Sequence, residues 1–165
     1  MAVLVYATLE DMKQSFGEDE LIELTDMVNI PPNTLDAIKV EKALQDATAK
    51  VNGYIGRVYR LPLAGCSDPA NPAGVLPPPV LIRLTCDIAR YFLHDDRAPE
   101  TEVYRRFKAA EDELQSIAEG GMLLACPLGD SPGELITVDP LNPGGQTIYS
   151  FSDRKITDKL VGGYR

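Results

Sequence analysis

Apolar residues over the first two thirds of the chain recur at the alternating three- and four-residue steps that place side chains on one face of a helix. Between about residues 36 and 57 these steps join a first set of apolar positions: Leu44, Ala47, Val51, Tyr54 and Val58. The same steps recur within residues 81–91 and 103–117. The pattern predicts three long amphipathic helices, and we expect one core made from Leu44, Val51, Tyr54, Leu84, Ile88, Phe107, Leu114 and Ile117.

Start and stop signals add two short helices before the long ones. Thr8 followed by Asp11 is typical of a capping box, and Gly17 predicts the end of that first helix. The stretch EDELIELTD then predicts a second short helix, and the prolines within residues 29–33 predict a turn. A proline-rich loop over residues 62–79 cannot continue any helix, although its last prolines suit the first turn of the next one.

The chain changes character at Gly120 and Gly121, which end the last predicted helix. The residues that follow are rich in Gly and Pro, with short β-favouring runs LITV and TIYSF. Residues 1–119 hold 20 acidic and 12 basic side chains, whereas residues 120–165 hold 5 and 4. We therefore predict a mainly α fold, with a small bundle of three long and two short helices in residues 1–121 and an extended, partly β C-terminal arm in residues 122–165.

The predicted arm carries apolar groups that are too few to form a core of their own. Two arrangements are open: the arm packs over the helical body as a hairpin, or it reaches a partner and becomes ordered on binding. The glycine-containing stretches NPGGQ and GGYR favour the second arrangement. We predict that a partner contacts the apolar side chains of the arm, namely Ile148, Tyr149, Phe151, Leu160 and Tyr164.

Charge and cysteine content narrow the classes of function. The net charge is −9, and no stretch of Lys and Arg is dense enough to follow a phosphate backbone, so adhesive binding to DNA or to membranes is not expected. The three cysteines, Cys66, Cys86 and Cys126, lack any CxxC or Cys/His ligand spacing. We therefore expect free thiols in a reducing compartment.

No segment approaches the roughly 18 apolar residues of a membrane span, and no basic leader precedes the first apolar run, which favours a cytoplasmic protein.

The stretch DIARYFLHDDRAPETEVYRRF contains the single histidine of the chain and invites a search for a metal or acid/base site. Helical geometry places Arg83, Asp87, Arg90 and His94 on one flank of the apolar face. Asp87 and His94 lie seven residues apart, about 10.5 Å along the axis, which is too far to share an ion. We therefore expect a structural ladder of opposite charges and no metal or cofactor.

Two other classes of function stay open. A metal-assisted hydrolase would use His94, Asp95 and Asp96, although the chain has no nucleophile motif beside the histidine and the two aspartates point about 100° apart on a helix. A monomeric interaction module would use the helices alone to bind a small partner. We therefore expect that the protein is not an enzyme.

Three successive blocks of the chain resemble the Mu-like phage and prophage family of head-completion proteins, which are head–tail adaptors of the neck. The blocks are YATLEDMKQSFGEDELIELTD, ALQDATAKVNGYIGRVYRLPL and LIRLTCDIARYFLHDDRAPETEVYRRFKAAEDELQSIAEGG. The most telling pieces are YATLEDM, the tyrosine followed by LPL, and CDIARY followed by DDRAPE. Together the blocks cover most of residues 6–121.

The resemblance implies a structural protein of the virion neck, assembled in the host cytoplasm. It implies a homo-oligomeric ring, a dodecamer, that joins the portal protein to tail-side neck proteins while DNA passes through the lumen. It also implies partner contacts at Tyr59, Leu61 and Leu63. An acidic lining would let DNA slide, whereas a basic one would hold it, but a charge of −9 equally serves to keep a protein soluble.

Overall fold

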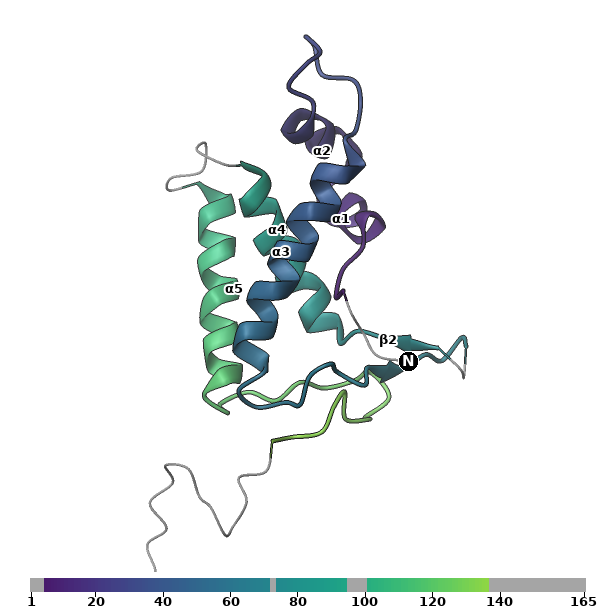
Figure 1. Cartoon of the computed structure of the whole chain (residues 1–165), viewed down its shortest axis with the longest axis vertical. Coiled ribbons are helices and arrows are strands. Elements are labelled where there is room, and N and C mark those ends of the chain that lie inside the picture. The colour runs from purple at the N-terminus through teal and green to yellow at the C-terminus, as the bar shows by residue number, and fades with distance from the viewer. Residues whose placement is uncertain (1–4, 72–73, 95–100, 137–165) are drawn as a thin grey trace, which may run out of the picture.

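The computed structural model describes residues 5–71, 74–94 and 101–136 of the 165-residue chain. Within them lie two short helices, three long helices and one small antiparallel sheet (Figure 1). The elements in chain order are α1 (Leu9–Phe16), α2 (Glu18–Thr25), α3 (Ala37–Ile55), β1 (Cys66–Ser67), β2 (Val75–Leu76), α4 (Pro79–His94) and α5 (Glu102–Ala118). The prediction of a mainly α fold is confirmed.

The long helices form the body, and the short ones cover one side of it (Figure 1). Helix α4 packs against both α3 and α5, and it also contacts α1 and α2. Helix α3 likewise contacts all the other described helices, so the facing apolar sides of α3 and α4 form the centre of the core. Leu81, Leu84 and Ile88 on that face are completely buried.

Local signals in the sequence place the helix ends. The Asp11 backbone N–H donates to Thr8 Oγ1 at 3.3 Å, and the Thr8 N–H donates to Asp11 Oδ2 at 2.7 Å, which confirms the predicted capping box. Gly17 and Gly120 have φ values of 88° and 76°, a region that favours glycine, and each terminates a helix as predicted. Asp36 caps α3 by accepting from the N–H groups of the next turn.

The predicted core is largely correct. Seven of its eight residues are buried in a single cluster, and Tyr54 is half-buried against it. The buried position in the last turn of α3 belongs to Ile55, four residues after Val51, and α3 ends there, two residues before the predicted end. Val58 therefore lies in the following turn and packs only partly against the core.

Candidate partner interface

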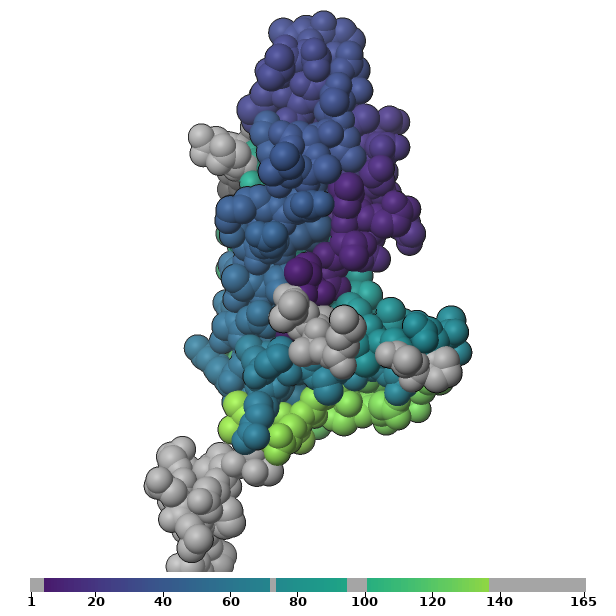
Figure 2. Space-filling model, turned by 45° about the vertical axis from the view of Figure 1, so that its right-hand side comes forward, coloured from purple at the N-terminus to yellow at the C-terminus, as the bar shows by residue number. Residues whose placement is uncertain are grey.

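The chain after α5 folds back along the loop that follows α3. We call residues 122–136 the C-terminal segment. The Arg60 N–H donates to the Glu134 carbonyl at 2.8 Å, and the Ile136 N–H donates to the Val58 carbonyl at 2.7 Å, so the two stretches pair in an antiparallel bridge at Tyr59 and Leu135. Figure 2 shows the segment in yellow-green along the lower edge of the body. The segment is thereby attached to the body through its backbone.

Side chains beneath the C-terminal segment are buried by it. Tyr59 and Leu63 are 2% and 0% exposed, and the Leu124 N–H donates to the Tyr59 hydroxyl at 2.9 Å. A Cβ on Gly133 would lie 2.9 Å from Leu63 Cδ2, so glycine is what lets the backbone pass this close. Both residues therefore belong to the core, beneath the segment.

The residues predicted to contact a partner are thus not all at the surface. Among Tyr59, Leu61 and Leu63, only Leu61 is exposed, at 37%. A partner could reach Tyr59 or Leu63 only if the C-terminal segment moved. The other five lie outside the described residues: Ile148, Tyr149, Phe151, Leu160 and Tyr164. The partner contacts stay a prediction.

A disulfide between Cys66 and Cys126 joins the C-terminal segment to β1, with Cα atoms 5.4 Å apart. The expectation of three free thiols was therefore wrong. The two cysteines are 60 residues apart in sequence, and only the packing of the segment against the loop brings them together. Cys86 is free but buried, and burial raises the pKa of its thiol to about 12, so it is not a thiolate at neutral pH.

For residues 122–136 the structure shows the first of the two arrangements considered for the arm, in which it packs on the body. The expectation that the chain reaches away from the body directly after Gly121 was wrong for this stretch, because Leu124 and Cys126 are buried there. Residues 137–165 lie outside the described residues. The division of the chain into a body and an arm therefore stays a prediction.

The C-terminal segment and its neighbouring loop form a surface suited to binding rather than to chemistry. Arg60 and Glu134 pair at its edge at 3.4 Å, and both are largely exposed. Five large apolar side chains of the loop and the segment are exposed: Leu61, Leu123, Leu128, Leu135 and Ile136. Exposed apolar side chains of this size at adjoining positions, such as Leu135 and Ile136, make the segment a candidate contact surface for another protein.

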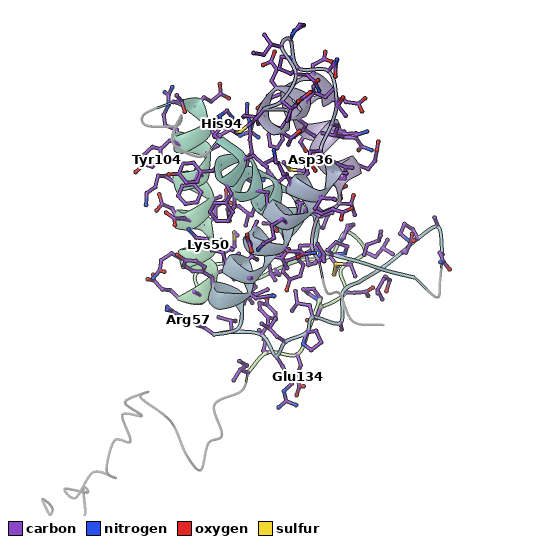
Figure 3. All side chains as sticks on the ribbon, turned by 45° about the horizontal axis from the view of Figure 1, so that its top comes forward. Asp36, Lys50, Arg57, His94, Tyr104 and Glu134 are labelled. Carbon is purple, nitrogen blue, oxygen red and sulfur yellow. A yellow bond between two sulfur atoms is a disulfide. The ribbon has the colours of Figure 1, made fainter. Side chains whose placement is uncertain are left out.

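The predicted ladder runs along α4, and His94 at its end lies far from Glu134, near the other end of the molecule (Figure 3). Asp87 is only 4% exposed, and its Oδ1 lies 2.9 Å from Arg106 Nε on α5. Burial raises the pKa of Asp87 above its ordinary value, while Arg106 and Arg83 act in the opposite direction. The carboxylate therefore joins α4 to α5.

The remaining two residues of the ladder face the short helices. Arg90 Nε lies 2.6 Å from Glu20 Oε1, and His94 Nε2 lies 3.8 Å from the same oxygen. The Arg90 guanidinium also lies 4.6 Å from the ring centroid of Phe16. The ladder thus connects α4 to α1, α2 and α5, which agrees with the predicted structural role.

No metal site is found within residues 5–71, 74–94 and 101–136, where no three His, Cys, Asp or Glu side chains are placed to hold an ion. Asp95 and Asp96, which the hydrolase alternative requires, lie outside the described residues. No helix in the same described ranges has the length and apolarity to cross a bilayer.

We expect His94→Gln to change the free energy of unfolding by less than about 1 kcal/mol, because Gln keeps a polar group of similar reach beside Glu20. Arg90→Gln is the matched control on the same helix, and it should cost more because Arg90 makes the shorter contact with Glu20. Urea denaturation compares the two variants. Elemental analysis of the parent and of His94→Gln should give the same metal content, and loss of a bound ion in the variant would show that His94 is a ligand.

Comparison with known proteins gives the family. Residues 6–134 match the family described as Bacteriophage Mu, Gp36, a range that includes all five helices and reaches Glu134 in the C-terminal segment. Over 91 residues the chain is 34% identical to the Mu-like prophage FluMu protein gp36 of Haemophilus influenzae. The aligned stretch is 55% of this chain and 56% of that protein, so the chain spans about half the length of the curated relative it matches.

Proposed function

This chain belongs to the Bacteriophage Mu Gp36 family, and we propose that it acts in the neck of a tailed phage as an adaptor between the portal and the tail. Family membership makes it a Mu-like phage protein with a role in particle structure or morphogenesis. In the proposed role it completes the filled head and supports attachment of the tail. The proposal includes no catalytic step.

The observation that carries this proposal is the anchored C-terminal segment. It is held by the Cys66–Cys126 disulfide, by the backbone bonds to residues 58–60 and by the buried Leu124. An extended arm that grips a neighbouring subunit transmits force to the place where it leaves the body, so that place needs strong attachment. Residues 137–165 follow directly from this anchor, and they carry the apolar runs predicted to contact a partner.

The proposed partners are the portal protein on one side and tail-side neck proteins on the other. We propose a dodecameric ring located in the virion neck, assembled in the host cytoplasm, with DNA passing through its lumen. The net charge of −9 supports a lumen that does not hold DNA, because acidic side chains repel the phosphate backbone.

The test is a phage whose gene for this protein ends after Ile136. The shortened protein keeps the disulfide and every described contact, so it should melt like the full chain. We expect filled heads without tails, or heads that lose DNA, when lysates are viewed by electron microscopy. Ordering an arm costs about 1 to 2 kcal/mol per residue in backbone entropy, so contacts must be spread over many of its residues.

Single substitutions provide the graded control. Tyr149→Ala and Phe151→Ala should each reduce tail attachment by less than the truncation does, because each removes one contact among several. A normal yield of infectious particles from the truncated gene would show that the arm is dispensable and that the proposed role for it is wrong.

A further inference from the structure

The turn between α2 and α3 projects from the body and is apolar at its surface (Figure 1). We call residues 27–35 the α2–α3 tip; they contain no charged side chain. Met27, Val28 and Ile30 are 72%, 89% and 98% exposed, and Ile38 in the adjoining first turn of α3 is 79% exposed. These are the four most exposed large apolar side chains among the described residues, and all lie in the tip or beside it.

A single carboxylate organises the tip. Asp26 Oδ1 accepts from the backbone N–H groups of Val28 and Asn29, and Oδ2 accepts from the Asn29 side chain and from the N–H groups of Asn33 and Thr34. The bonds from Asn33 and Asn29 hold the pKa of Asp26 well below its usual range. The tip is therefore an ordered projection, and a partner that binds it does not have to order it first.

A hollow of about 520 Å³ lies beside the tip, between the α2 end, α3 and the α4 end. Its apolar lining consists of Leu24, Met27, Ile38, Ala43, Phe92 and Leu93. Clefts of this volume accommodate a ligand the size of several apolar side chains. The tip of the same chain does not fill it, because Val28 and Ile30 are almost fully exposed.

The charged residues of the hollow already have partners in the chain. Lys42 Nζ lies 2.5 Å from Asp46 Oδ1, and Lys39 Nζ donates to the Thr25 carbonyl at 2.7 Å. A charged occupant would compete with these contacts, whereas an uncharged apolar occupant would leave them in place. The hollow therefore matches the chemistry of the α2–α3 tip, which is uncharged and apolar.

We propose that the α2–α3 tip of one copy of this protein occupies the hollow of a second copy. Met27 and Ile38 belong to both the tip region and the hollow, so one two-fold contact between two copies covers both surfaces on each. The contact concerns free copies of the chain before any ring forms, because neighbouring subunits of a cyclic ring are not related by a two-fold axis. It therefore goes beyond the proposed neck role and can fail or hold independently of it.

The first test compares Ile30→Asp with Leu128→Asp in the purified full-length protein. Leu128 is a matched control because it is also exposed, at 58%, but lies in the C-terminal segment. Sedimentation equilibrium should show pairing of the parent and of Leu128→Asp, and pairing weaker by about tenfold or more in Ile30→Asp. At a protein concentration too low for the parent to pair, neither variant should shift the melting temperature, since both side chains are exposed. A parent that stays monomeric at high concentration, or equal pairing in both variants, would overturn the proposal.

The second test identifies which surfaces meet. One sample of Ile30→Cys is mixed with one of Phe92→Cys and treated with a short thiol crosslinker; the natural cysteines are either in the disulfide or buried. We expect a covalent pair of one variant with the other. A mixture of Leu128→Cys with Phe92→Cys should give none. If Ile30→Cys links only to itself, the tips meet each other and the hollow is not their site. If Ile30→Asp impairs capture of purified portal and leaves pairing unchanged, the tip serves another protein and the proposal is wrong.

Discussion

Leu84→Ala is expected to lower the free energy of unfolding by about 2 to 5 kcal/mol. Leu84 is completely buried on α4, which packs against both of the other long helices. Removing its side chain loses apolar burial and leaves a cavity that the surrounding helices can close only in part. Urea denaturation followed by circular dichroism measures the change.

The matched control is Leu128→Ala, which shortens an apolar side chain in the C-terminal segment that is 58% exposed. It should change the free energy of unfolding by less than about 0.5 kcal/mol. If Leu84→Ala were as stable as the parent, the assignment of the apolar face of α4 to the core would be wrong.

A chain that ends at Gly121 is expected to lose more stability than Leu84→Ala does. It lacks Leu124, whose burial contributes about 1.5 to 3 kcal/mol, and it uncovers Tyr59 and Leu63. It also lacks the disulfide, and a cross-link spanning 60 residues contributes about 4 kcal/mol through the entropy of the unfolded chain. The sequence alone had predicted the opposite, a stable body that ends at Gly121.

Two further variants separate the contribution of the disulfide to stability from the contribution of the residues after Ile136. The chain that ends after Ile136 should melt like the full chain, because every described contact is retained. Full-length Cys126→Ser should lose stability relative to the parent under oxidising conditions, and the difference should largely disappear when both are reduced. If the chain ending at Gly121 melted at the parent temperature, residues 122–136 would contribute nothing to the fold.

The helices, their ends and most of the core could be predicted from the sequence because their causes are local. Amphipathic spacing depends on residues three and four apart, and a cap such as Thr8 with Asp11 acts within one turn. Gly17 and Gly120 end helices because they adopt positive φ at no steric cost. The one misplaced core position, Tyr54 for Ile55, comes from taking the three-residue step after Val51, whereas the side chain four residues after Val51 is the buried one.

The partner surfaces could not be predicted in this way, because long-range packing decides them. Tyr59 and Leu63 were predicted as surface contacts, but the C-terminal segment covers them. The exposed α2–α3 tip was predicted only as a turn, since the sequence does not show that Val28 and Ile30 point away from the body. The sequence signal for an exposed apolar tip is its composition, because residues 27–35 are nine consecutive residues without a charged side chain.

The sequence by itself determined the mainly α fold, the helix boundaries to within about three residues and the ladder of charges along α4. Only the tertiary structure decided that Cys66 bonds to Cys126, that Asp87 is buried beside Arg106 and that the chain after Gly121 closes over the body. Each of these contacts joins residues roughly 20 to 80 positions apart. Local periodicity carries no information on such pairs, because the side chains meet only after the helices have packed and the loops have closed.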